Sequence, residues 1–167
     1  MNAHNVPSRQ FGFTLVEAMV VMALLAVFMT TLTSLFVRAI DVQSKSEAYA
    51  ATVSDARYIM ARLDYDIARA TSVSTPASLG STSTNLVMVI GGVNYTYAVN
   101  SGNLQLTDGS GTDQLNGSGV LVSGVSFLRL GNSGGKESIR YSFTLTSTAK
   151  HVSGSDIRTY TSTTERR

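Results

Sequence analysis

Cysteine is absent from the 167 residues of this chain. Its absence excludes disulfide bonds, zinc sites built from thiolates and catalysis by a cysteine nucleophile. Charge is scarce too: Asp, Glu, Lys and Arg make up 14% of the residues, with 13 basic side chains against 11 acidic ones. This near balance does not indicate a strongly charged partner. No nucleophile-elbow motif accompanies the many serines, so we expect neither an enzymatic activity nor a cofactor.

Charge is missing altogether from residues 18–37 near the N-terminus. An uncharged apolar run of about 20 residues is long enough for a helix to cross the hydrocarbon core of a bilayer, which is about 30 Å thick. One acidic residue, Glu17, lies at the start of this run. A carboxylate inside a membrane segment costs about 2.5–3.5 kcal/mol, so Glu17 calls for a functional explanation.

The residues around Glu17 form a recognisable motif. Residues 12–18 read Gly-Phe-Thr-Leu-Val-Glu-Ala. This segment resembles the cleavage and methylation motif of type IV prepilins and type II secretion pseudopilins. That motif has a glycine, then a phenylalanine, and a glutamate as the fifth residue of the mature chain. The alternative is an ordinary single-pass anchor that carries a glutamate by accident.

The resemblance implies how the N-terminus is processed. A prepilin peptidase would cut after Gly12 on the cytoplasmic side, remove a leader of residues 1–12 and retain the apolar helix, and Phe13 would be methylated. A glycine at the cut allows the protease to approach the backbone closely. A conventional signal peptidase would find little to cut, because no Ala-x-Ala-like site follows the apolar run. The implied location is the bacterial inner membrane, with the N-terminus in the cytoplasm and the rest exported, and then a periplasmic or extracellular fibre.

Cleavage would give Glu17 a partner. The new amine on Phe13 of one subunit can meet the Glu17 carboxylate of its neighbour, and in a medium of low dielectric such a pair is better than either charge alone. We therefore interpret Glu17 as a device that sets the register of subunits during assembly. A pair within one helix is the alternative, because the two residues are four apart.

The helix is expected to continue to residue 70, because no proline or glycine interrupts residues 13–70. Its second half is amphipathic, and Asp41 and Lys45 form an i,i+4 pair. The apolar face is predicted to contain Tyr49, Val53, Ala56, Met60, Leu63 and Ile67. The other faces are predicted to carry Asp55, Arg57, Arg62, Asp64 and Arg69. Many major pilins have a proline where this chain has Ser34, so we expect a more continuous helix here.

The remainder of the chain is predicted to be β-rich. Residues 71–84 and 108–119 have the composition of loops, and Gly91-Gly92 is a two-residue hairpin signal. Strands are predicted at residues 86–90, 93–99, 104–107, 120–122, 125–130, 139–146 and 157–163. The predicted fold class is therefore α+β, with one long N-terminal helix against an antiparallel sheet, as in pilins. The organisation is a leader (1–12), a membrane or fibre-core helix (13–40), an amphipathic helix (41–70) and one head domain (71–167).

A second segment resembles a particular subtype. Residues 63–70, Leu-Asp-Tyr-Asp-Ile-Ala-Arg-Ala, are similar to the corresponding segment of J-type minor pseudopilins and W-type minor pilins. The head is short for a J-type protein. The resemblance implies a low-abundance subunit of a tip or initiation complex. The implied partners are other pilin subunits, the prepilin peptidase, membrane lipid, a platform protein and an assembly ATPase.

The other candidate sites are weaker. Asp108 and Asp113 belong to an oxygen-rich segment that faintly resembles a calcium loop, but it lacks the terminal bidentate glutamate, so we favour a solvated turn and no metal. The basic C-terminal end offers charges for DNA phosphates, yet no aromatic residues interleave them, which favours a solvated edge. It comprises Lys150, His151, Arg158, Arg166 and Arg167. Asn94 and Asn116 begin glycosylation sequons, which are frequent by chance.

Two functions remain open from the sequence. The first is a structural subunit of a type IV pilus or type II secretion pseudopilus. The alternative is a membrane-anchored adhesin or binding module that never polymerises. Glu17 discriminates between them, because a simple anchor has no use for a carboxylate at that position.

Overall fold

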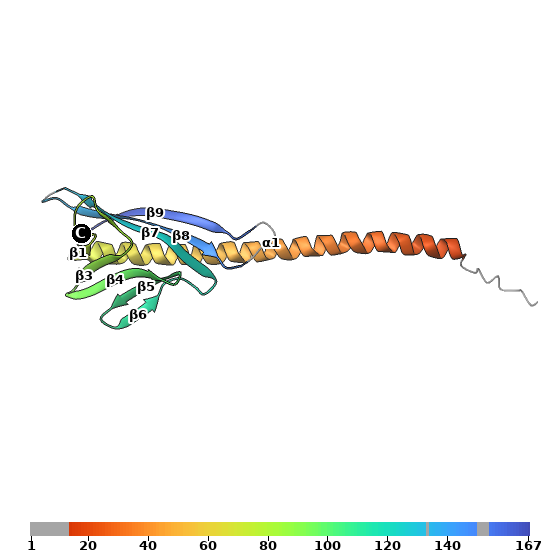
Figure 1. The fold of residues 1–167 in the computed structure, drawn as a ribbon, viewed down its shortest axis with the longest axis horizontal. Coiled ribbons are helices and arrows are strands. Elements are labelled where there is room, and N and C mark those ends of the chain that lie inside the picture. Colours follow the sequence, from red (N-terminus) through yellow and green to blue (C-terminus); the bar gives the residue numbers. More distant parts are fainter. Residues whose placement is uncertain (1–13, 133, 150–153) are drawn as a thin grey trace, which may run out of the picture. The chain divides into compact units, whose positions relative to one another are not determined.

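The computed structural model describes residues 14–132, 134–149 and 154–167. The chain forms two compact units, one ending at Ile40 and the other comprising Asp41–Arg167. One helix, α1 (Leu15–Arg69), contributes residues to both units. It is followed by nine strands, which all belong to the second unit (Figure 1). The described residues therefore form an α+β fold, with one long helix and antiparallel β-structure, as the sequence predicted.

The helix begins with the apolar run and continues through Ser34, as predicted. The ion pair between Lys45 Nζ and Asp41 Oδ2 is present at 3.0 Å. The predicted apolar face, however, is partly wrong. Tyr49 is 48% exposed, whereas two polar residues, Thr52 and Asp66, are completely buried. The buried positions of α1 are Ala48, Thr52, Ala56, Ile59, Leu63, Asp66 and Ile67.

The strands form two antiparallel sheets where the sequence suggested one. The five-stranded sheet has the order β1-β3-β4-β5-β6 and the four-stranded sheet the order β2-β7-β8-β9. The first contains β1 (Ser72–Thr75), β3 (Leu86–Ile90), β4 (Val93–Asn100), β5 (Asn103–Asp108) and β6 (Gly111–Gln114). The second contains β2 (Thr82–Ser83), β7 (Val120–Gly131), β8 (Glu137–Ser147) and β9 (Ile157–Glu165).

Five predicted strands are confirmed within a few residues, namely β3, β4, β5, β8 and β9. The predicted loop at 71–84 contains β1 and β2, and the predicted loop at 108–119 contains β6. The two strands predicted at 120–122 and 125–130 are one strand, β7, with a bulge between Ser123 and Ser126. Gly124 lies inside this bulge with φ +58°, a conformation that glycine adopts without strain.

The core of the second unit is formed by α1 and by the inner faces of both sheets. The alternation predicted for β8 is confirmed, because Ile139, Tyr141, Phe143 and Leu145 are all buried. Tyr97 of β4, from the other sheet, is buried as well. Burying such side chains stabilises the fold by about 1.5–3 kcal/mol each relative to leaving them exposed.

Candidate functional site

The N-terminal motif is described from Thr14 onward; the predicted cleavage and methylation positions, Gly12 and Phe13, lie outside the described residues. Thr14 precedes the first helical residue, and its Oγ1 accepts a hydrogen bond from the Glu17 amide at 3.2 Å. Its carbonyl accepts one from the Ala18 amide at 3.1 Å. Thr14 therefore caps the helix.

Glu17 occupies the third helical position after this cap, which is where a Thr-x-x-Glu capping box places its acid. The sequence carried this signal, but the reasoning from sequence did not use it. The bond to Thr14 involves the Glu17 amide, whereas the Glu17 carboxylate makes no hydrogen bond or ion pair within the described parts of the chain. A negative charge in the first turn also interacts favourably with the helix dipole.

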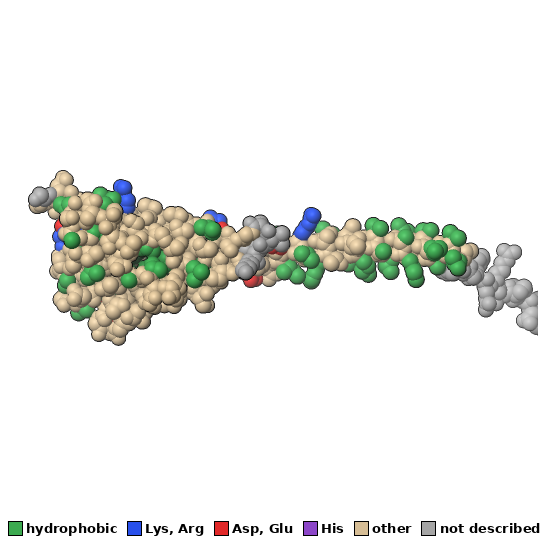
Figure 2. Space-filling view, viewed as in Figure 1, with side chains coloured by type: hydrophobic (Ala, Val, Ile, Leu, Met, Phe, Trp, Pro, Cys, Tyr) green, Lys and Arg blue, Asp and Glu red, His purple; other side chains and the backbone are tan. Residues whose placement is uncertain are grey.

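The apolar run is exposed along its whole length. Large hydrophobic side chains from Leu15 to Val37 are each at least half exposed, and Figure 2 shows them along the visible side of this part of the helix. The helix that contains this run, α1, is the one helix in the described chain that is long and apolar enough to cross a membrane, judged by length and composition alone. Because contact between so many apolar side chains and water is unfavourable, the segment requires lipid or other apolar helices around it.

Polar side chains inside the run are satisfied locally. Four hydroxyls donate to carbonyl oxygens three or four residues earlier, for example Thr33 Oγ1 to the Met29 carbonyl at 2.8 Å. The others are those of Thr30, Thr31 and Ser34. These bonds remove most of the cost of placing hydroxyls in an apolar medium. The run can therefore enter lipid in spite of them.

The segment 63–70 joins α1 to the five-stranded sheet. Asp66 is completely buried and accepts three hydrogen bonds: from Arg62 Nε at 2.9 Å, Arg69 Nη2 at 2.7 Å and the Tyr97 hydroxyl at 2.5 Å. Burial raises the pKa of Tyr97, and the hydrogen bond to the Asp66 carboxylate raises it further. The carboxylate is thus fully paired, as a buried charge requires. The side chain of Tyr65, from the same segment, is exposed and has the Arg69 guanidinium 3.8 Å from its ring centre.

Asp64, which was predicted to lie outside the apolar face of the helix, joins the same turn of α1 to the four-stranded sheet. Its Oδ1 accepts from the Tyr141 hydroxyl at 2.7 Å and from Thr164 Oγ1. Burial raises the pKa of Tyr141, and the bond to Asp64 adds to the shift. Together Asp64 and Asp66 attach the end of the helix to both sheets.

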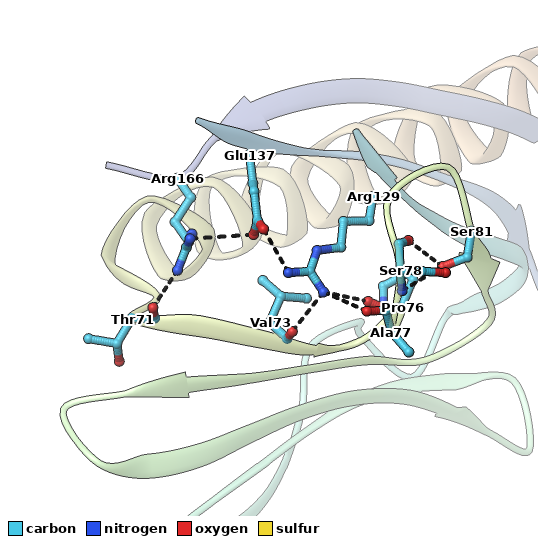
Figure 3. A network of polar contacts seen from close by, with 9 residues as sticks. All are labelled: Thr71, Val73, Pro76, Ala77, Ser78, Ser81, Arg129, Glu137 and Arg166. Carbon is cyan, nitrogen blue, oxygen red and sulfur yellow. Dashed lines mark hydrogen bonds and ion pairs between the residues drawn. The ribbon is translucent and has the colours of Figure 1, made fainter. Parts of the chain in front are cut away.

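A further polar network holds the segment that follows α1 (Figure 3). Arg129 of β7 donates through Nη1 to the carbonyls of Val73 (3.0 Å), Pro76 (3.1 Å) and Ala77 (3.0 Å). Its Nη2 donates to Glu137 Oε1 at 2.7 Å. The Arg129 and Glu137 side chains are only 14% and 16% exposed. The network fixes β1 against β7 and β8.

The C-terminal basic residues that the structure describes mostly have structural partners. Arg166 donates to the Thr71 carbonyl and lies 3.4 Å from Glu137 Oε2. Arg158 pairs with Asp156 at 3.0 Å and lies over the ring of Tyr49, 4.4 Å from its centre. Lys150 and His151 lie outside the described residues. Arg167 is exposed.

The oxygen-rich segment forms a hairpin turn between β5 and β6. Asp108 Oδ1 accepts from the Ser110 hydroxyl at 2.6 Å and from its amide at 2.8 Å, and these two bonds lower the pKa of Asp108. Asp113 lies on β6 and is exposed. Within the described parts of the chain, no three His, Cys, Asp or Glu residues are grouped to hold a metal ion. Of the two sequons, Asn94 is exposed, whereas Asn116 is buried and its Oδ1 accepts from the Leu104 amide.

Comparison with known proteins gives one match. The family model for the prokaryotic N-terminal methylation motif matches residues 7–33. No curated protein and no solved structure matches the chain. The matched segment contains Gly12, Phe13 and Glu17 and most of the apolar run.

Proposed function

Residues 7–33 carry the N-terminal methylation motif that is the signature of type IV pilins and pseudopilins, and from this premise we propose that the chain is a structural, non-enzymatic subunit of a type IV pilus or type II secretion pseudopilus. The motif supports processing by a prepilin peptidase. The observation that carries the proposal is the combination of this motif with an apolar run whose large hydrophobic side chains, from Leu15 to Val37, are each at least half exposed.

In this proposal the peptidase cuts between Gly12 and Phe13, and the new amine on Phe13 is methylated. The precursor is held in the inner membrane by the apolar run and exports its β-rich head. A platform protein and an assembly ATPase then extract it into a fibre, in which other subunits replace lipid around the apolar helix. The exposed hydrophobic side chains support this exchange, because neighbouring apolar helices and lipid tails are equally apolar surroundings.

Glu17 is proposed to set the register during extraction, by pairing with the Phe13 amine of a neighbouring subunit. Its carboxylate has no partner among the residues that the structure describes, which supports this role. The competing explanation is helix capping, because Glu17 completes a capping box with Thr14. The register role requires a negative charge on Glu17, whereas the capping role does not.

The experiment compares Glu17→Gln with Glu17→Ala in cells that assemble the fibre. Glutamine serves a capping box as well as glutamate does, but it cannot pair with an amine as a charge. We expect both variants to be cleaved and both to be lost from sheared fibres by at least about tenfold. Normal incorporation of Glu17→Gln would contradict the register role, and absence of the natural chain from the fibres would favour a membrane-anchored module that does not polymerise.

We further propose that the chain is a minor subunit of the J- or W-type, placed in a tip or initiation complex. The support is the resemblance of residues 63–70, Leu-Asp-Tyr-Asp-Ile-Ala-Arg-Ala, to the corresponding segment of those subtypes. Counting subunits in sheared fibres by quantitative mass spectrometry tests this assignment. A minor subunit is present at a few copies per fibre, whereas an abundance equal to that of the main subunit would contradict it.

A further inference from the structure

The segment that joins β6 to β7 contains the only Asn-Gly pair of the chain, Asn116 and Gly117. In an unfolded chain such a pair is especially prone to lose the asparagine amide, because the glycine that follows has no Cβ to hinder attack by its backbone nitrogen. The sequence alone therefore marks Asn116 as the first asparagine to deamidate. In the fold, however, Asn116 is only 4% exposed.

The reaction has defined requirements. The Gly117 amide nitrogen loses its proton and attacks Cγ of Asn116. The new N–Cγ bond closes a five-membered imide, the Cγ–Nδ2 bond breaks, and Nδ2 takes up a proton and leaves as ammonia. Water then adds to one of the two imide carbonyls and opens the ring, which leaves aspartate or isoaspartate at position 116. Water is the only reagent, but the Gly117 nitrogen must be free and the Asn116 carboxamide must be able to turn.

The attacking nitrogen is held by α1. The Gly117 amide donates to Asp55 Oδ2 at 2.8 Å, and this bond must break before the nitrogen can attack. A carboxylate is too weak a base to take a proton from a backbone amide, and its negative charge disfavours a deprotonated nitrogen beside it. A Cβ at position 117 would lie 3.3 Å from the same Oδ2, so the contact that restrains the pair also favours glycine there.

The carboxamide under attack is held as well. Its Oδ1 accepts from the Leu104 amide at 2.8 Å. Its Nδ2 donates to the Val120 carbonyl at 2.6 Å and lies 3.3 Å from Asn103 Oδ1 and 3.4 Å from the Gly117 carbonyl. These contacts fix the plane of the carboxamide. The three groups around Nδ2 are all acceptors, so none of them supplies the proton with which ammonia leaves.

We propose that Asn116 is a deamidation site that the folded head keeps closed, and that Asp55 is the positioning residue that protects it. While Asp55 holds the Gly117 amide, the nucleophile and its target are both fixed. When this contact opens, the reaction proceeds and cannot reverse, because ammonia is lost. The product places a carboxylate oxygen against the Val120 carbonyl, where Nδ2 had donated, and two buried acceptors then face each other. The segment cannot return to its place, and the altered residue is a permanent record of the opening.

The first test uses the natural full chain, purified in detergent and incubated in mildly alkaline buffer with and without urea. Mass spectrometry of its peptides follows each asparagine, because replacing an amide by an acid changes the mass. In urea we expect Asn116 to react first. Without urea its rate should fall by at least about 100-fold, because the reaction then waits for local opening. The exposed Asn100, which precedes Ser101, is the internal control and should change by less than about tenfold.

Asp55→Ala and Asp55→Asn are the matched variants. Alanine removes the acceptor of the Gly117 amide, whereas asparagine keeps an acceptor oxygen without the charge. We expect Asp55→Ala to raise the deamidation rate of Asn116 in the folded chain by at least about tenfold, and Asp55→Asn to raise it by less than about threefold. Deamidation of Asn100 should stay the same in both.

A third variant separates this role from stability in general. Tyr97→Phe removes a buried bond to Asp66 elsewhere in the same core and leaves the contact between Asp55 and Gly117 in place. We expect it to lower the urea midpoint without raising the deamidation rate of Asn116. Acceleration equal to that of Asp55→Ala would assign the protection to overall stability and overturn the role of Asp55.

Other results would overturn the inference too. Deamidation of Asn116 at similar rates with and without urea would show that the fold does not close the site, and this comparison needs no variant to fold. A lower rate in Asp55→Ala than in the natural chain would show that the carboxylate promotes the reaction. The inference does not depend on the proposed function, because every group involved belongs to the second unit of one chain.

Discussion

Replacing Asp66 by asparagine should loosen the head from its helix. Asp66 is completely buried and accepts bonds from Arg62, Arg69 and Tyr97. Asparagine keeps the shape but turns one acceptor into an amide donor and removes the charge. The Tyr97 hydroxyl, or one guanidinium, then loses its acceptor inside the protein.

The magnitude follows from the burial of each partner. A buried hydroxyl left without an acceptor costs about 1–3 kcal/mol. The side chains of Arg62 and Arg69 are 34% and 41% exposed, so water compensates them, and each lost pair costs about 0.5–1 kcal/mol. We therefore expect Asp66→Asn to lower the free energy of unfolding by about 2–5 kcal/mol. This is a large share of the 5–15 kcal/mol typical of a domain.

The assay is urea unfolding of the full chain in detergent, followed by near-ultraviolet circular dichroism of its tyrosines. Tyr97→Phe alone should cost about 1 kcal/mol, because Asp66 keeps both arginines. In the Tyr97→Phe background the effect of Asp66→Asn should shrink by about 1 kcal/mol, since the two residues share one bond. A loss below about 0.5 kcal/mol for Asp66→Asn, or strict additivity in the double variant, would refute the role of this cluster as an anchor.

Three other changes have expected outcomes. Folding raises the pKa of Tyr97 and Tyr141, whereas tyrosine in an unfolded chain ionises near pH 10. The unfolded chain therefore loses these protons first, and the free energy of unfolding should fall as the pH rises above about 10. Urea titrations at pH 8 to 11 that show no fall would contradict this. Arg129→Met should cost about 2–4 kcal/mol in the same assay and expose residues 71–77 to protease, because it frees three carbonyls and leaves Glu137 with Arg166 as its remaining ion-pair partner. Equal protease resistance would argue against it. Gly102→Ala should lower the free energy of unfolding by about 1–2 kcal/mol, because φ is +80° and the new Cβ would lie 2.9 Å from the Leu121 Cδ2 methyl group. An unchanged urea midpoint would be contrary evidence.

The parts of the fold that were predictable are those with a strong local pattern. The apolar run needed only its length and its missing charges. β8 needed only the alternation of Ile139, Tyr141, Phe143 and Leu145 with polar residues. The Gly91-Gly92 signal correctly placed the turn between β3 and β4. In each case the physical cause lies within a few neighbouring residues.

The errors occurred where the cause lies far along the chain. Asp66 is buried because Tyr97, 31 residues later, donates to it, and a helical wheel cannot reveal that partner. Tyr49 lies outside the core although it is large and partly apolar, and the Arg158 guanidinium covers it instead. β1, β2 and β6 have two to four residues and no alternation, so they are defined only by the strands beside them. The division into two sheets likewise depends on pairing between distant segments.

The candidate site divides in the same way. The motif at Gly12, Phe13 and Glu17 is local and was recognised from seven residues. The capping role of Thr14 was also readable, as a Thr-x-x-Glu pattern, but it was overlooked. The basic C-terminal residues favoured a solvated edge, and β9 ends its sheet, but the sequence does not show which strand lies beside it. Edge strands become visible only when all the pairings are known.

The central claim is that this chain enters a fibre through cleavage of its N-terminal motif. Its most direct test is mass spectrometry of the intact protein and of its N-terminal peptide, purified from membranes of cells with and without their prepilin peptidase. The account predicts a chain that begins at N-methylated Phe13 in the first case and retains residues 1–12 in the second. A chain that keeps residues 1–12 in both preparations would contradict it and leave a membrane-anchored β module in its place.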